Sequence, residues 1–326
     1  MSTDTTGTTA RDDQRGVGTG AMDVDASSSL GMLALRSPLI AWEFIRRWPV
    51  IPGAVICIFV ITVIFAGQIA TDDPNRQILR ASMAAPAWNS EYYEQNTRLD
   101  RRYLLGADQF GRDIFSRVVF GTRVSITVAF AAAAIGMTVG LWAGIASGWF
   151  GGWFDEAMTR FVDIWNGLPF LLVALVVSIT VGTGITVLIL LLVMATWVGL
   201  VRNIRAEVLS LRTRDYIASA RVSGASDFRI MFRHIMPGVI NLLMVLASLR
   251  IGGLILAEAS LSYLGIGVPS RFPSWGNMIS DGREFLDTGW WISFFPGLCI
   301  FLVVMSFNFV GDWVRDRTDP RLRQVR

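Results

Sequence analysis

The residues with the greatest potential for chemistry are five polar side chains that interrupt long apolar runs of the sequence. They are Asp163, Asn166, Arg250, Glu258 and Asn308. If the runs cross a membrane, a charged group near its centre costs about 2.5–3.5 kcal/mol, so it faces another helix or a water-filled passage. The chemistry that these residues predict is therefore non-covalent: contact with a polar solute, or pairing between helices.

Each of these residues also has a purely structural interpretation. For Asp163, with Asn166 beside it, we favour a carboxylate at the membrane surface that pairs with Arg160. Arg250 and Glu258 share one face of a helix, about 12 Å apart along its axis. For these two residues, lining of a solute passage and structural pairing with a neighbouring helix or permease are equally supported. Asn308, on the last apolar run, is expected to make a hydrogen bond between helices.

Catalytic and metal centres are not expected in this chain. His234 is its single histidine, and Cys57 and Cys299 both lie within apolar runs, so neither a metal cluster nor a disulfide is predicted. The sequence contains no lysine, so it lacks the phosphate-binding loop that many ATPases use. We predict a protein that is not an enzyme and carries no cofactor of its own.

The composition indicates an integral membrane protein. Apolar residues make up 52%, charged residues 17%, and the mean hydropathy is +0.48. Soluble domains typically contain about 45–50% apolar and about 25% charged residues. This excludes a disordered protein, a disulfide scaffold and a nucleic-acid-binding domain. Six runs suit helices that cross about 30 Å of hydrocarbon, so we predict an all-α polytopic protein with six transmembrane helices, near residues 49–70, 124–147, 161–182, 185–200, 238–261 and 290–310.

The arginines indicate how these spans are oriented. They concentrate in residues 201–236, in the C-terminal tail and just before the first span, which places all three on the cytoplasmic side. The outer loop also carries eight arginines, but the rule weakens for a loop of this length. We expect a disordered cytoplasmic tail (1–35), an interfacial helix and first span (36–70), an extracytoplasmic loop (71–123), a core of five spans (124–312) that includes a cytoplasmic loop (201–237), and a cytoplasmic C-terminal tail (313–326).

The cytoplasmic loop 201–237 is the most informative part of the sequence. Asp215 is suited to cap a short helix of small residues that Gly224 ends. Ser226 or Asp227 is suited to cap a second helix, which Pro237 is expected to break before the fifth span. A two-turn helix lined by alanines fits a groove in another protein, and an ordinary amphipathic loop on the membrane is an equal alternative.

The loop resembles the EAA loop of ABC importer permeases. Ala218, Ser219 and Ala220 stand for the E-A-A triplet, and Gly224 and Pro237 follow at the family spacing. Three more segments resemble the C-type permease of dipeptide and oligopeptide importers, in the same order: LGADQFGRDIFSR at 105–117, LSYLGIG with PSWGNM within 261–278, and FNFVGDWVRDRTDP at 307–320.

This resemblance implies a type I importer fold with a MetI-like core and a coupling helix that docks on a cytoplasmic ATPase. It also implies a homologous B-type permease, two ABC ATPases that bind ATP and magnesium, an extracytoplasmic peptide-binding protein, and lipid of a bacterial cytoplasmic membrane. The expected task is inward movement of short peptides by alternating access. The residues that would contact the ATPase are Asp215, Tyr216, Ala218, Ser219, Ala220, Gly224 and Ala225.

Other functions remain possible at this point. Nickel, glutathione or an oligosaccharide could replace peptides as cargo within the same branch of importers. A secondary transporter driven by an ion gradient would use intramembrane carboxylates, and Glu258 is the residue that favours it. A membrane scaffold has no positive feature in this sequence.

Overall fold

The structure is a computed structural model that describes residues 49–96, 99 and 101–318. These residues belong to the second of two units, which covers residues 48–326. The predicted disordered tail, the interfacial helix before the first span and the last residues of the C-terminal tail lie outside the described residues.

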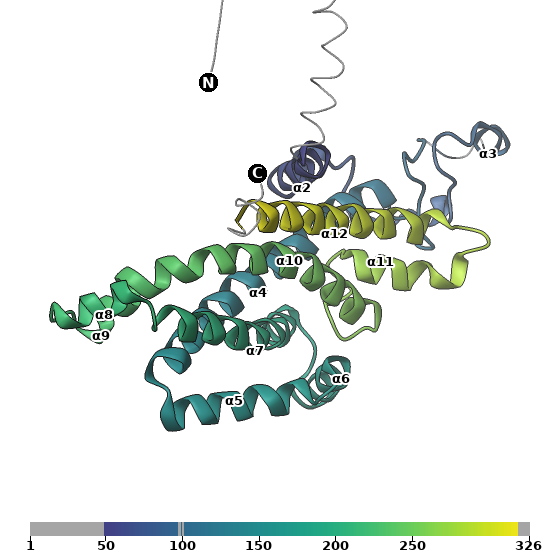
Figure 1. Cartoon of the computed structure of the whole chain (residues 1–326). Helices are drawn as coiled ribbons and strands as arrows, with labels where there is room; N and C mark the ends of the chain where they lie inside the picture. Colours follow the sequence, from purple (N-terminus) through teal and green to yellow (C-terminus); the bar gives the residue numbers. More distant parts are fainter. Residues whose placement is uncertain (1–48, 97–98, 100, 319–326) are drawn as a thin grey trace, which may run out of the picture. The chain divides into compact units, whose positions relative to one another are not determined.

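The described part of the chain is helical throughout and contains no strand (Figure 1). Its helices are α2 (Val50–Ile69), α3 (Ser90–Gln95), α4 (Ile114–Phe150), α5 (Gly152–Asn166), α6 (Phe170–Val181), α7 (Ile185–Leu211), α8 (Asp215–Val222), α9 (Asp227–Ile230), α10 (Met236–Tyr263), α11 (Trp275–Gly282) and α12 (Trp291–Thr318), with short helical turns η1 (Leu79–Ala81), η2 (Met231–Ile235) and η3 (Arg283–Phe285).

The apolar regions agree with the sequence prediction, except that the third is not one helix. Within the described residues, α2, α4, α7, the continuous helix 227–263 and α12 are long and apolar enough to cross a membrane, and α5 with α6 forms a sixth region bent by 90°. The break falls at Gly167–Pro169, since proline donates no backbone hydrogen bond and disfavours a helical conformation at Leu168 before it. The prediction of a straight third span beginning near residue 161 is wrong.

Helices α4 and α7 pack closely because α4 carries a glycine at every fourth position. Cβ atoms added to these glycines would lie 2.7–2.9 Å from side-chain atoms of α7, a separation that only glycine permits. The glycines and their neighbours are, in order, Gly136 with Thr196, Gly140 with Leu200, Gly144 with Ile204 and Gly148 with Val208. Both series rise together, so α4 and α7 run parallel, and α5 with α6 must return the chain from the end of one to the start of the other.

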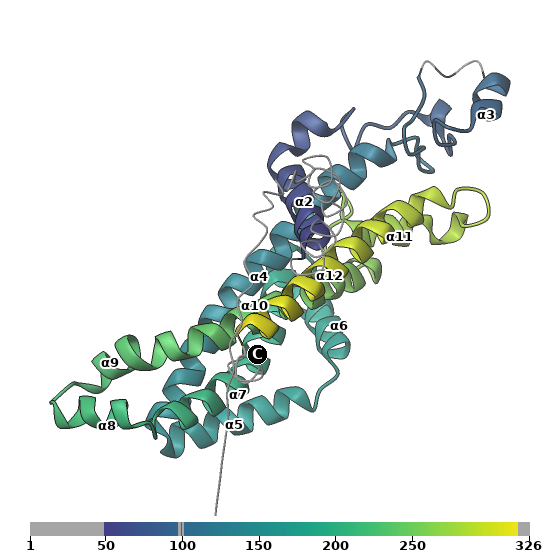
Figure 2. The same ribbon diagram turned by 45° about the horizontal axis from the view of Figure 1, so that its top comes forward.

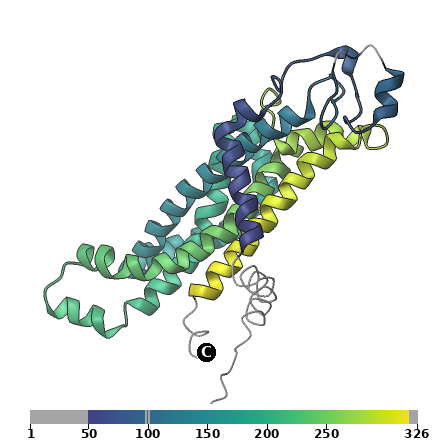
Figure 3. The ribbon, with the colours of Figure 1, turned by 90° about the horizontal axis from the view of Figure 1, so that it is seen from above.

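The other long helices complete a bundle around α4 and α7. Helix α10 packs on α12, α4, α7 and α11, and α2 packs on α4 and α12. A buried core joins α4, α7, α10 and α12, and it includes Trp275 of α11, whose indole N–H donates to the carbonyl of Val118 at 3.2 Å. Helices α8 and α9 lie at one end of this bundle, and α3 and α11 lie toward the opposite end (Figures 2 and 3).

Several helices extend beyond their predicted ends. Helix α4 begins at Ile114 rather than near residue 124, because the Asp113 side chain caps it by accepting the N–H of Ser116. Helix α7 continues to Leu211, and α12 continues to Thr318, so the predicted start of the C-terminal tail at residue 313 is helical. Each extension contains charged residues, and hydropathy alone does not detect it.

Pro237 does not break the helix before the fifth span, contrary to prediction. The turn before it is a π-helix, Met231–Ile235, and the N–H of Met236 donates to the carbonyl of Met231. A wider turn relieves the clash that a proline ring makes with the preceding turn of an α-helix. Residues 227–263 therefore form one continuous helix.

Candidate functional site

The coupling segment predicted from the sequence forms a projection at one end of the bundle. Helix α8 lies between the end of α7 and the start of α9 (Figure 1). Ile217 is its one buried residue, and it packs with Leu211, Ile230 and Ile235 in a single apolar cluster. The guanidinium of Arg221 lies 4.7 Å from the ring centroid of Trp149 in α4. The segment is thus attached to the bundle through one face of α8.

The ends of α8 are formed by backbone geometry. Its N-cap is Arg214, without a side-chain hydrogen bond, so the prediction that Asp215 caps the helix is wrong; Asp215 is in the first turn, where a carboxylate interacts favourably with the helix dipole. The predicted stop at Gly224 is found: its φ is +76°, a conformation that glycine adopts at little cost. The N–H of Ala225 donates to the carbonyl of Ala220 at 3.1 Å across this turn.

The outer face of the segment is open to a partner. Val222 is 91% exposed, Phe228 68% and Tyr216 46%, so apolar side chains project beside the small residues. All seven residues that the sequence assigned to ATPase contact lie within this projection. Five of them are exposed and two are partly buried: Asp215, Tyr216, Ala218, Ser219 and Gly224 are exposed, and Ala220 and Ala225 are partly buried.

Asp163 pairs with a different arginine from the one predicted. Its carboxylate contacts the guanidinium of Arg202 in α7, whereas Arg160 pairs with Glu156 one turn away at 2.6 Å. The side chain of Asp163 faces α7, so its partner comes from α7 and not from the next turn of α5. Both members of the Asp163 pair are more than half exposed, and Asn166 at the end of α5 is exposed as well.

Arg250 lies near the middle of α10 and packs over α7. Its Nη1 donates to the carbonyl of Ala195 at 3.4 Å. A Cβ added to Gly199 would lie 2.8 Å from Nη1, so the guanidinium occupies space that this glycine leaves open. The ion pairs of the described residues do not include Arg250.

Glu258 and Asn308 belong to the packing between helices. Glu258 is fully buried, and its Oε1 accepts the hydroxyl of Ser262 at 2.8 Å. Its Oε2 has no hydrogen-bond partner among the described residues. Asn308 lies beside Gly252 of α10 and makes no hydrogen bond to another described residue, so the predicted interhelical bond is not found.

The five polar residues lie on three helices: Asp163 and Asn166 on α5, Arg250 and Glu258 on α10, and Asn308 on α12. Helices α5 and α10 both pack on α7, which runs between them (Figure 1). Arg250 and Glu258 make no ion pair, although both lie on α10. The structure does not gather the predicted set at one place.

Sequence reasoning missed the polar contacts that hold α5 against its neighbours. Asp155 accepts hydrogen bonds from Arg205 of α7, one of them at 2.6 Å, and from Ser147 of α4. At the same end of the bundle, Arg212 just after α7 donates to the carbonyl of Gly148 in α4 at 3.0 Å, which joins α7 to α4. A carboxylate in the first turn of α5 was a visible signal, but seven arginines between residues 201 and 236 gave it several possible partners.

A second missed cluster lies at the opposite end of the bundle. Asp108 accepts from Arg112 at 2.6 Å and lies 3.3 Å from Arg117. The same two guanidinium groups reach Asp281 of α11 at 3.2 and 3.4 Å. This buried network ties the LGADQFGRDIFSR segment to α11, and it explains why acidic residues accompany the arginines of the outer loop.

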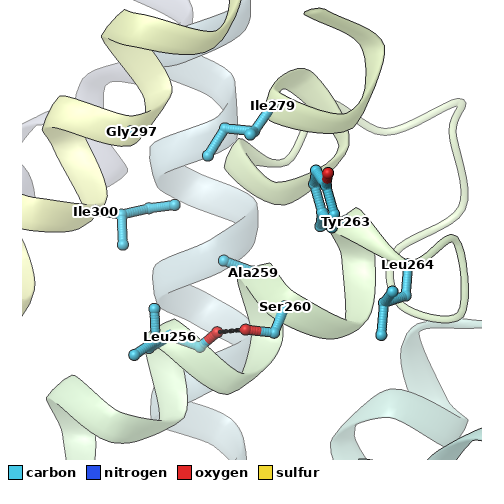
Figure 4. Close-up of a pocket in the computed structure, with 8 residues that line it drawn as sticks. All are labelled: Leu256, Ala259, Ser260, Tyr263, Leu264, Ile279, Gly297 and Ile300. Carbon is cyan, nitrogen blue, oxygen red and sulfur yellow. Dashed lines mark hydrogen bonds between the residues drawn. The ribbon is translucent and has the colours of Figure 1, made fainter. Parts of the chain in front are cut away.

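An apolar pocket of about 420 Å³ opens between α10, α11 and α12. Leu256, Ile279 and Ile300 line it with Tyr263 (Figure 4). The hydroxyl of Ser260 donates to the carbonyl of Leu256 within α10 at 2.8 Å, so it is occupied within its own helix. Apart from the hydroxyl of Tyr263, the side chains of these walls offer a peptide no free polar partner.

Comparison with known proteins identifies the family. Residues 136–324 match the family described as the inner membrane component of binding-protein-dependent transport systems. The chain belongs to this family. The dipeptide transport system permease protein DppC of Escherichia coli is 41% identical to this permease over 285 residues, which cover 87% of this chain and 93% of that protein.

Two further comparisons bear on this permease. The glutathione transport system permease protein GsiD of Pectobacterium atrosepticum is 36% identical over 240 residues, 72% of this chain and 80% of that protein. The inward-facing MetNI methionine ABC transporter has a chain that matches with a TM-score of 0.51 at 18% identity, over 62% of this chain and 96% of that one. This likeness confirms the expected fold of type I importer permeases.

Proposed function

We propose that this permease moves short peptides into the cytoplasm as one membrane subunit of an ATP-driven importer. The observation that supports peptides as the cargo is the 41% identity to a dipeptide permease over 87% of the chain. Glutathione is the second candidate, because a glutathione permease is 36% identical over 72% of the chain. Peptides and glutathione both present a carboxylate and amide groups, so one passage suits both.

The coupling role is assigned to α8 and the turn that follows it. An ATPase subunit would receive the exposed faces of Asp215, Tyr216, Ala218 and Ser219, while Ile217 holds α8 to the bundle. This end faces the cytoplasm because its loop is rich in arginine. A homologous permease, two ATPases and an extracytoplasmic binding protein complete the importer, and the loop 71–113 belongs to the side where that binding protein docks.

Substitution at Gly224 tests the coupling role. Nothing lies within 4 Å of a Cβ at this position, so a large side chain fits within this chain but projects toward a docked partner. Gly224→Trp is expected to reduce peptide-stimulated ATP hydrolysis and uptake by more than tenfold in the complete importer in liposomes. Gly224→Ala places a side chain at the same positive φ of +76° but without the bulk of tryptophan. This variant should retain most of the ATP hydrolysis and most of the uptake.

Two results would contradict the assignment. Equal loss in both variants would mean that backbone strain causes the effect. Normal ATP hydrolysis and normal uptake in Gly224→Trp would mean that no ATPase docks at this turn.

A further inference from the structure

No acidic side chain of the described residues pairs with Arg250. Arg250 is the fifteenth of the 28 residues of α10, so it lies at the middle of a membrane-spanning helix. A guanidinium has five N–H donors, and within the part of the chain that the structure describes Arg250 makes one hydrogen bond, to the Ala195 carbonyl at 3.4 Å. The acidic residues Asp155 and Asp163 of α5 pair with Arg205 and Arg202, and Glu258 is buried and accepts the hydroxyl of Ser262.

Gly199 gives this guanidinium a defined position. The planar group lies against the α7 backbone, with Nη1 2.8 Å and Cζ 3.0 Å from the place that a Cβ of Gly199 would occupy. The side chain is half-buried, so part of it remains accessible. A seat of this kind holds the donors in one orientation, and that orientation favours a planar, two-oxygen acceptor.

A polar pair lies on α7 one turn from the seat of Arg250. Arg202 is three residues after Gly199 and hence one turn closer to α8, and its pair with Asp163 is exposed. The same turns of α7 contact α5 on their other side, where Phe161 stacks on Trp197 with ring centroids 5.5 Å apart. Helix α5 ends soon afterwards at Asn166, where the broken span leaves backbone groups outside regular helix.

We propose that Arg250 binds the C-terminal carboxylate of the transported peptide in the membrane-embedded passage. The inference rests on the proposed peptide cargo and assigns a group to recognise it. An unpaired cation at the centre of a span marks a solute pathway rather than a lipid contact, and a free peptide carries the planar anion that the seated guanidinium lacks. A carboxylate of the second permease is the other possible source of this anion, and the experiment separates the two.

The test compares one dipeptide as its free acid and as its C-terminal amide. A sequence is chosen whose two forms both load on the binding protein, and uptake is measured with the complete importer in liposomes. Arg250→Gln is expected to lower free-acid uptake at least tenfold relative to wild type and to leave amide uptake within twofold. Arg250→Lys should recover part of the free-acid uptake, because it restores the charge without the planar fork.

A second pair of variants changes the seat of Arg250 and keeps its charge. Gly199→Val displaces the guanidinium and should also reduce uptake of the free acid selectively. Gly253→Val, on α10 with nothing within 4 Å of its Cβ, is the matched control and should change neither form. Gel filtration of each complex shows that the variants still assemble.

The outcomes separate the inference from the function on which it rests. Equal loss of both forms in assembled Arg250→Gln would overturn the inference and assign Arg250 to a partner carboxylate. Unchanged uptake of both forms would overturn it as well. If the wild-type importer moved neither form, the peptide cargo itself would be wrong, and the inference would fall with it.

Discussion

At the scale of single residues, Asp72 shows how charge orders the loop that follows α2. Its carboxylate lies 2.9 Å from the guanidinium of Arg101 and 3.5 Å from that of Arg76, and it accepts the Asp73 N–H at 2.8 Å. Burial by itself raises the pKa of the Asp72 carboxyl, but the Asp73 N–H and the two arginines outweigh burial. The pKa of Asp72 therefore lies below its usual 3.8.

This lowered pKa predicts a pH dependence of the loop. A carboxyl whose folded pKa is depressed stabilises the fold above its unfolded pKa, and that stabilisation is lost as the pH falls through the folded value. Asp72→Asn should increase amide hydrogen exchange near residues 101–107 several-fold at pH 7, relative to wild type at the same pH. The difference should shrink as the pH falls below 3.8 and disappear once the pH is below the lowered pKa of folded Asp72. A difference that persisted in strong acid would show that the charge of Asp72 is not its cause.

At the scale of elements, the contact of α4 with α7 depends on glycine. An added side chain at Gly144 would meet the Cβ of Ile204 at 2.7 Å, within a parallel pair that spans most of the bundle. The small-residue spacing is the pattern by which membrane helices approach closely. The helices can accept a larger residue there only by moving apart.

Gly144→Leu is therefore predicted to destabilise the permease. Overpacking of a tight contact costs about 1–3 kcal/mol or more, which should appear as a lower midpoint of thermal unfolding in detergent, followed by tryptophan fluorescence. Gly67→Leu on α2, where nothing lies within 4 Å of a Cβ, supplies the control. Similar midpoints for the two variants would argue that α4 and α7 are not held together by this contact.

The same elements show how far the sequence could be read. Apolar runs predict most of the spans because hydrophobic length is a local property, and Gly224 predicts the end of α8 because its φ requires glycine. Pro169 was a visible signal for the break between α5 and α6, but its apolar surroundings concealed it. The partners of Asp155 and Asp163 could not be predicted, because the packing of α5 on α7 decides which arginine each meets.

At the scale of the whole molecule, the two ends of the described bundle should face opposite sides of the membrane. Val222 is 91% exposed at the α8 end and Leu79 is 72% exposed at the other. A membrane-impermeant maleimide should label Leu79→Cys in intact cells from which any outer membrane has been removed. Val222→Cys should react only after the cells are opened. Wild type, with Cys57 and Cys299 alone, sets the background, and the reverse pattern would invert the proposed orientation.

The position of α8 in the chain has a mechanical consequence. Helix α8 lies between α7 and the continuous helix 227–263, so a displacement of α8 would be transmitted to both of them. Between Gly199 and Leu211 α7 contains neither glycine nor proline, and the same holds for α10 between Gly238 and Arg250, so each stretch acts as a stiff strut of about 18 Å. The stretch of α7 begins at Gly199, and the stretch of α10 ends at Arg250, whose guanidinium packs against Gly199. On the proposed coupling role, an unequal displacement of the two helices would move the guanidinium of Arg250 away from Gly199 and so weaken its hold on a bound carboxylate.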